Sequence, residues 1–199
     1  MKRTELTELQ YIIPIANVAS GLQHGILSHA RVQALAHTSV AMPAIQARRS
    51  AIVVPGQGGR PLHEYVNLYI CARNPMLFVR KGQHESLCVL RIRTDVIDLP
   101  GVVVTSGNAS SGYIRFGAGA AGLEVVDRSL TFAEYWTDQD AIVQYQKKCA
   151  KCAEVLVPDV VNPQYVVGAY VSGNVAMAAF TATGVNLTAT IDRHLFFYP

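Results

Sequence analysis

The 199-residue chain has a small net charge, few cysteines and no long hydrophobic run. Its 17 Lys and Arg against 14 Asp and Glu give a net charge of +3, which excludes a strongly basic protein that coats nucleic acid. Apolar runs such as residues 175–180 fall far short of the roughly 20 residues in a membrane helix, so no membrane partner is expected. The acidic N-terminus lacks the apolar segment of a secretory signal, which favours a cytoplasmic protein.

Cysteine patterns and common enzyme motifs are also scarce. The four cysteines are too few for a disulfide scaffold in a chain of this length, and we expect reduced thiols. Cys149 and Cys152 form a CxxC pair, but no second pair of ligands accompanies them, so we expect no metal. No phosphate loop, HExxH or GxSxG motif is present, and no GxGxxG motif follows an expected strand, which removes the usual support for several enzyme classes.

Half of the residues are hydrophobic, and short runs of them predict an α+β domain that spans residues 1–199. Alternation predicts a half-buried strand at 65–70 and a second at 87–93. Further short strands are expected at 11–15, 102–105, 153–157, 165–171 and 195–198, in a bent or split sheet. We expect Asn17 to cap a helix over 18–24 that Gly25 ends, and Thr137 or Asp138 to cap another through Tyr145. Residues 28–61 are expected to be rich in loops.

Polar residues inside apolar segments are the candidates for chemistry. Glu154 interrupts a strand, and because an unpaired buried carboxylate is costly, it either has a partner or lines a cleft. A strand-edge pair with Lys147, Lys148 or Lys151 is the structural alternative. Arg73, at a strand-to-turn junction, suits recognition of pyrophosphate or carboxylate, or binds loop carbonyls.

The segment 106–115 combines small residues with side chains that could stack on a base or contact phosphate. An ordinary surface turn explains the same composition. Paired arginines at 48 and 49 lie in the long early loop, where a solvated face is the structural alternative. The six histidines lack metal-ligand spacing.

Four segments taken together resemble the DarT family, toxin enzymes of bacterial toxin–antitoxin pairs that ADP-ribosylate DNA. They are LHEYVNLYICARNPML at 62–77, LPGV at 99–102, GNASSGYIRF at 107–116 and CAEVLVP at 152–158. The similarity runs in order over roughly residues 9–172. It implies an ADP-ribosyltransferase fold in which a split, bent sheet and short helices surround a central NAD+ cleft.

The resemblance implies transfer of ADP-ribose from NAD+ to a base of single-stranded DNA. Thymidine is the expected acceptor, through a ring nitrogen, and guanosine is the alternative because the family contains branches that modify either base. Glu154 matches the catalytic glutamate. A catalytic arginine falls in the segment 45–49, where we prefer Arg49 to Arg48. A macrodomain antitoxin of the DarG type is the implied protein partner. The alternatives are transfer to protein or RNA, and a non-catalytic module that binds single-stranded nucleic acid.

Two sets of binding residues follow from the same resemblance. The residues expected to contact NAD+ are Gln10, Tyr11, Ile12, Ile13, Asn17, Tyr69, Arg73 and Met76. The residues expected to contact DNA are Arg48, Asn108, Ser111, Tyr113 and Arg115. The first strand departs from the family pattern, because Ile12 stands where members commonly have an NAD+-contacting histidine. We expect backbone groups of Ile12 and Ile13 to hold the nicotinamide amide instead.

Overall fold

The computed structural model describes residues 1–33, 35–39, 42–56 and 58–198. An eight-stranded sheet in the order β10-β9-β4-β1-β3-β7-β5-β6 forms its centre. Only the β9–β10 pair is parallel among these neighbours. The strands are β1 Leu9–Pro14, β3 Tyr65–Tyr69, β4 Leu87–Ile92, β5 Val103–Thr105, β6 Phe116–Ala118, β7 Glu154–Pro158, β9 Val166–Val171 and β10 Ala189–Ile191. A separate short pair joins β2 Ile26–Leu27 to β8 Val160–Val161.

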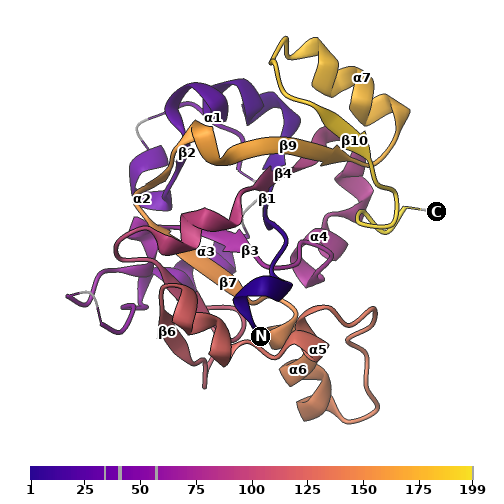
Figure 1. The fold of residues 1–199 in the computed structure, drawn as a ribbon. Helices are drawn as coiled ribbons and strands as arrows, with labels where there is room; N and C mark the ends of the chain where they lie inside the picture. The colour runs from indigo at the N-terminus through magenta and orange to yellow at the C-terminus, as the bar shows by residue number, and fades with distance from the viewer. Residues whose placement is uncertain (34, 40–41, 57, 199) are drawn as a thin grey trace.

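Short helices surround the sheet (Figure 1). In Figure 1, α7 lies beside β9 and β10 at the top, α1 to α3 gather on the left, and α5 and α6 lie at the bottom. The α-helices are α1 Val18–His24, α2 His29–Val32, α3 Pro43–Ser50, α4 Pro75–Val79, α5 Arg128–Thr131, α6 Ala141–Ala150 and α7 Asn174–Ala182. The 3-10 turns are Arg3–Glu5, Ile15–Asn17, Leu62–Glu64, Lys81–Ser86, Thr94–Asp98, Ala120–Val125 and Pro163–Tyr165.

The two faces of the sheet are buried differently. On β3, Val66 and Leu68 point into the largest apolar cluster. Tyr69 and Tyr65 point to the other face and belong to two smaller clusters. Asn67 lies between these tyrosines and is only half-buried. The expected half-buried strand is therefore wrong in detail, because both faces of β3 are covered and only Asn67, which lines a cavity together with Tyr65, Val66 and Tyr69, is half-buried.

Strand positions follow the sequence well, and the main differences lie in the connections. Residues 195–198 do not form a strand: Leu195 and Phe196 are buried in a turn in which Phe196 N donates to Arg193 O. The segment expected to be loop-rich contains α2 and α3, with residues 34, 40–41 and 57 outside the described part. Proline at the first position of α3 suits a helix start, because no backbone donor is lost there.

Two expected helix caps are wrong. Asn17 precedes α1, but its side chain bonds the backbone of Thr38, with Nδ2 donating to the carbonyl at 2.7 Å. The positive φ of Gly25 does end α1, as expected. Asp140 caps α6 by accepting from the N–H groups of Ile142 and Val143.

Within the described residues, no helix has the length and apolar character needed to cross a membrane.

Candidate active site

A buried ion pair joins helix α3 to strand β7. Arg49 Nη1 lies 3.2 Å from Glu154 Oε1 and 3.3 Å from Oε2. Glu154 is 1% exposed and Arg49 is 5% exposed, so neither charge is solvated. The partner of Glu154 is therefore this arginine, and the expected alternative of a pair with a nearby lysine is wrong.

Local structure on both sides holds this pair. Glu154 is the first residue of β7 and pairs with Tyr69 of β3. Its backbone N–H donates to Thr105 Oγ1 at 3.1 Å, which ties it to β5. Arg49 lies in the last turn of α3, where a cation is favoured by the helix dipole. Arg48, its neighbour on the helix, is exposed, because successive helical residues point about 100° apart.

Two opposite effects act on the pKa of Glu154, namely its burial and the guanidinium of Arg49. Burial raises the pKa of the Glu154 carboxyl, while the Coulomb attraction and hydrogen bond of Arg49 act to lower it. Burial, and then the charge of Glu154, also hold the pKa of Tyr69 well above its usual value. Tyr69 therefore stays a neutral phenol, and the charge in the site is confined to the Arg49–Glu154 pair.

The pair lines a cavity of about 380 Å³, within the range of small-molecule sites. The structure brings nine of the sequence-predicted site residues to its wall. They are Glu154, Arg49, Tyr11, Ile12, Ile13, Asn17, Tyr69, Met76 and Asn108.

Gln10 and Arg73 do not line this cavity, although both are expected to contact NAD+. Both line a second cavity of about 300 Å³ instead. Gln10 is held there because it donates to Glu8 Oε1 and accepts from Ala72 N. Arg73 lies with its guanidinium 4.0 Å from the centre of the Phe197 ring. Arg73 lies in the turn that follows β3. Met76 lies in α4, the helix capped by the Asn74 side chain, and lines the first cavity.

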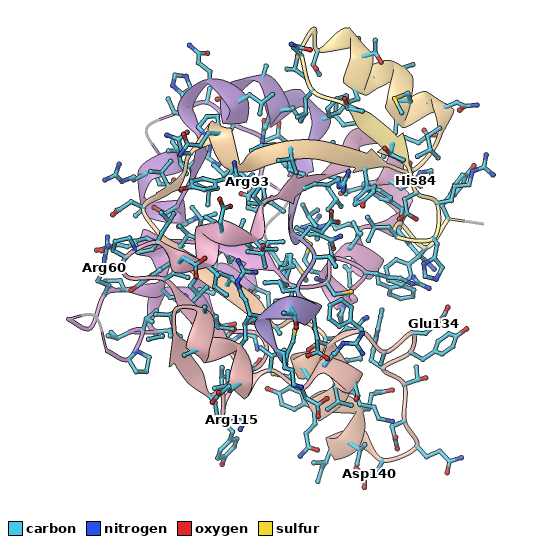
Figure 2. All side chains as sticks on the ribbon, viewed as in Figure 1. Arg60, His84, Arg93, Arg115, Glu134 and Asp140 are labelled. Carbon is cyan, nitrogen blue, oxygen red and sulfur yellow. The ribbon has the colours of Figure 1, made fainter. Side chains whose placement is uncertain are left out.

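Of the residues expected to contact DNA, Asn108 alone lines the first cavity. Ser111 is half-buried, and Tyr113 is fully exposed with a positive φ of 64°. Arg115 Nη2 donates to Val125 O at 2.8 Å, and Figure 2 shows its side chain at the lower edge of the molecule. These three residues belong to a loop that leads away from the cavity, and Arg48 faces solvent on α3.

The cavity also contains polar residues that the sequence did not single out. Asn67 alternates with Tyr65 and Tyr69 on β3, and this alternation was the available signal. Gln46 and His29 lie in the stretch expected to be loop-rich, where no periodicity marked them. Buried polar atoms without a hydrogen-bond partner among the described residues include Gln46 Oε1, Arg49 Nη2 and Tyr65 OH. A donor and acceptors are thus available at this wall for a polar ligand.

The chain matches the family model described as ssDNA thymidine ADP-ribosyltransferase, DarT, over residues 10–197. It is 30% identical over 200 residues to a DNA ADP-ribosyl transferase–DNA ADP-ribosyl glycohydrolase fusion protein of Thermosipho africanus. That match covers 96% of this chain and 50% of the fusion protein, so the chain spans about half of that relative. A DNA ADP-ribosyl transferase of Thermus sp. 2.9 is 30% identical over 149 residues, covering 69% of this chain and 71% of the relative.

Solved structures agree. Thermosipho africanus DarTG in complex with ADP-ribose superimposes with a TM-score of 0.81 at 30% identity, covering 96% of this chain and 51% of that one. Thermus sp. 2.9 DarT in complex with ADP-ribosylated ssDNA gives a TM-score of 0.82 at 24% identity, covering 98% of this chain and 100% of that one. The likenesses confirm the α+β ADP-ribosyltransferase fold. Over nearly its whole length, the chain belongs to the DarT family.

Proposed function

We propose that this chain transfers ADP-ribose from NAD+ to a base of single-stranded DNA, with thymidine as the acceptor. The observation that carries the proposal is the buried Arg49–Glu154 pair on the wall of a ligand-sized cavity in a DarT-family fold. Relatives named DNA ADP-ribosyl transferase support the activity. Related Thermus structures in complex with NAD+ and with ADP-ribosylated ssDNA support the two substrates.

The lining of the cavity suits NAD+. Tyr69 and Met76 offer an aromatic and a thioether surface, and Ile12 and Ile13 of β1 line the same wall. Asn17 and Tyr11 line the same wall. The unpartnered donor on Arg49 and the unpartnered hydroxyl on Tyr65 give a polar ligand places to bind. We therefore assign NAD+ to this cavity and leave Gln10 and Arg73 out of its contacts.

Glu154 would act on the ribose next to nicotinamide. Breaking the glycosidic bond develops positive charge on that ribose, as in glycoside hydrolysis. A carboxylate that binds a ribose hydroxyl fixes the sugar and stabilises this charge in a site that excludes water. Arg49 favours the ionised form of this carboxylate and so opposes burial, which raises the pKa of Glu154 and favours the neutral acid.

Arg49 would also act on the acceptor. A guanidinium remains protonated at neutral pH, so its role is to stabilise the negative charge left when the base nitrogen loses its proton. Its Nη2, which has no hydrogen-bond partner among the described residues, is the atom available for this contact. Single-stranded DNA suits the site because a duplex hides the ring edge that reacts.

The wider setting is part of the same proposal. Residues 1–199 form one ADP-ribosyltransferase domain that works in the cytoplasm as the toxin of a toxin–antitoxin pair. The fusion of a transferase with a DNA ADP-ribosyl glycohydrolase in the Thermosipho relative supports a DarG-type macrodomain partner. Asn108, Ser111, Tyr113, Arg115 and Arg48 are the proposed DNA contacts, with Asn108 nearest the chemistry because it lines the cavity.

Product mass tests the proposal directly. The protein is incubated with NAD+ and four single-stranded oligonucleotides, each of which contains only one base type at a central position. One ADP-ribose is expected on the thymidine strand, with release of nicotinamide. An adduct on RNA or protein alone would move the activity to another acceptor. Binding of strands with no adduct, from a folded preparation, would make the chain a non-catalytic binding module.

A further inference from the structure

Two histidines lie in contact beside the proposed active site, and the chemistry described above uses neither. His29 begins α2, and His63 lies in the 3-10 turn Leu62–Glu64. Their ring centres are 4.2 Å apart with the planes tilted by 45°. His29 lines the same cavity as Glu154 and Arg49, whereas His63 is not part of the cavity wall.

His63 ties this pair to the helix that carries Arg49. The turn that carries His63 packs against both α2 and α3, and the backbone of Gln46, one turn before Arg49 on α3, acts on the pKa of the His63 ring. Nε2 of His63 is buried and has no hydrogen-bond partner in the described part of the chain. The rings, α3 and Arg49 are therefore one packed unit, and His29 is its member on the cavity side.

Both rings are held in the neutral form. Burial lowers the pKa of His29, and the nearby positive charges of His37 and Arg49 lower it further. Burial also lowers the pKa of His63, followed by the effects of His29 and Arg49. No carboxylate is among the charged groups that act on either ring. At neutral pH the neutral His29 ring has one unprotonated nitrogen, which is able to accept a proton. Its Nε2 lies 3.4 Å from Nε2 of the Gln33 side-chain amide.

The proposed reaction needs a side chain that accepts a proton. A ring nitrogen of the base must lose its proton, and the Arg49 guanidinium cannot take it. Glu154 is paired with Arg49 and must stay ionised to act on the ribose. The tyrosines at the wall are protonated, and burial raises the pKa of the Cys152 thiol, so it is protonated as well. His29 and His37 are the imidazole side chains among the described residues that line the cavity.

We propose that His29 is a further catalytic residue, the general base that removes the proton from the acceptor nitrogen, a role that rests on the proposed DNA ADP-ribosylation. The N–H bond of the base breaks as the proton moves to a ring nitrogen of His29. The electron pair left on the base nitrogen forms the bond to C1′ of the ribose, and the bond from C1′ to nicotinamide breaks. Nicotinamide leaves with the electron pair of the broken C1′–nicotinamide bond. The imidazolium of His29 then releases its proton to solvent.

His29 is chosen over His37 because of its surroundings. His29 packs against the half-buried ring of His63, whose turn packs against α3, and this contact restrains the position of His29 relative to the helix that carries Arg49. His37 is exposed, and Nδ1 lies 3.0 Å from Leu35 O in its own loop. A base must be held within hydrogen-bond reach of the proton it removes, which favours the fixed ring.

The test compares His29→Asn with His37→Asn and with His24→Asn, an exposed control at the end of α1. We expect His29→Asn to lower kcat for transfer to the thymidine strand by roughly 100-fold or more, with the KM values for NAD+ and DNA little changed. The difference in kcat between His29→Asn and the wild type should shrink as pH rises, because the acceptor nitrogen of the DNA base then loses its proton to solvent. Imidazole added to a His29→Gly variant should restore part of the rate.

Two outcomes would overturn the inference while the proposed function stands. One is wild-type transfer together with an unchanged kcat in His29→Asn, and the other is a loss confined to His37→Asn. Absence of any wild-type adduct would instead remove the proposed function itself. If His29→Asn fails to fold, the wild-type pH profile decides: kcat should fall as pH drops through a value below the ordinary imidazole pKa of about 6.5, and a flat profile would count against His29.

Discussion

The buried Arg49–Glu154 pair places the strongest demand on stability at the residue scale. Two charges are removed from water, and each relies on the other for compensation. Replacing one partner leaves an uncompensated buried charge, which typically costs about 3–5 kcal/mol of unfolding free energy. Replacing both removes the problem, and such replacements are often close to neutral.

We therefore predict that Arg49→Gln and Glu154→Gln each destabilise the protein, and that the double variant is more stable than either single one. The expected single effects are about 3 kcal/mol, measured by urea unfolding followed by circular dichroism. Arg48→Gln, on the same helix but exposed, is the matched control and should change stability by less than about 0.5 kcal/mol. Additive effects in the double variant would show that the pair is not coupled.

The sequence identified the members of this pair but not their contact. Glu154 and Arg49 follow from the resemblance, yet they are 105 residues apart and meet only through the packing of α3 against the sheet. For Gln10 and Arg73, the sequence predicted the segment of chain near the cavity but not the direction of the side chain. Each is one or a few positions from a true cavity residue, but a turn or a local hydrogen bond directs the side chain into the second cavity.

At the scale of elements, most strands of the large sheet and helix α1 could be predicted, whereas strands β6 and β10 and the short helices α2 and α3 could not. β3 and β4 carry alternating or continuous apolar residues, which mark a strand without knowledge of its neighbours. α3 has eight residues, only one of which is buried, so its sequence has no apolar stripe that would mark a helix. Residues 195–198 are apolar because they fill a cluster beside Ile12 and Tyr69, and apolar character alone does not distinguish a buried turn from a strand.

The loop 106–115 is held against the end of α6 by a close approach of two backbones. A Cβ atom at Gly107 would lie 2.6 Å from the carbonyl oxygen of Cys149 and 2.8 Å from its sulfur. The backbone N–H of Asn108 donates to the same carbonyl at 3.2 Å, and Asn108 lines the first cavity. The absence of a side chain at Gly107 therefore sets the position of Asn108.

Gly107→Ala is predicted to displace this loop, with a loss of about 1–3 kcal/mol in stability and a higher KM for the DNA strand. Gly112→Ala, in the same loop with open space around it, is the control and should leave both values nearly unchanged. Thermal unfolding and steady-state transfer to the thymidine strand measure the two effects. Equal behaviour of the two variants would mean that the contact with Cys149 does not position the loop.

The charge of the whole molecule is dispersed. Ion pairs with carboxylates engage many of the basic residues, namely Arg3, Arg31, Arg60, Arg91, Arg93, Arg128 and Lys147. Arg49 is buried in the site, and Arg73 lies in the second cavity. The described residues also include exposed cations without an ion pair, namely Lys2, Arg48, Lys81, Arg115, Lys148 and Arg193, of which Arg48 and Arg115 are proposed DNA contacts. The net charge of +3 thus reflects cations that are dispersed and largely balanced by carboxylates.

This distribution predicts a shallow dependence of DNA binding on salt. Each phosphate contact to a single strand contributes about −0.7 to the slope of log affinity against log salt concentration. With exposed Arg48 and Arg115 as the main contacts, we expect a slope of about −1.4 to −2.1 for a labelled thymidine strand between roughly 50 and 200 mM salt. Arg48→Gln should make the slope shallower by about 0.7, because one phosphate contact is lost. A slope steeper than about −4 would require more phosphate contacts than Arg48 and Arg115 can make, and it would show that other exposed basic residues contact the DNA.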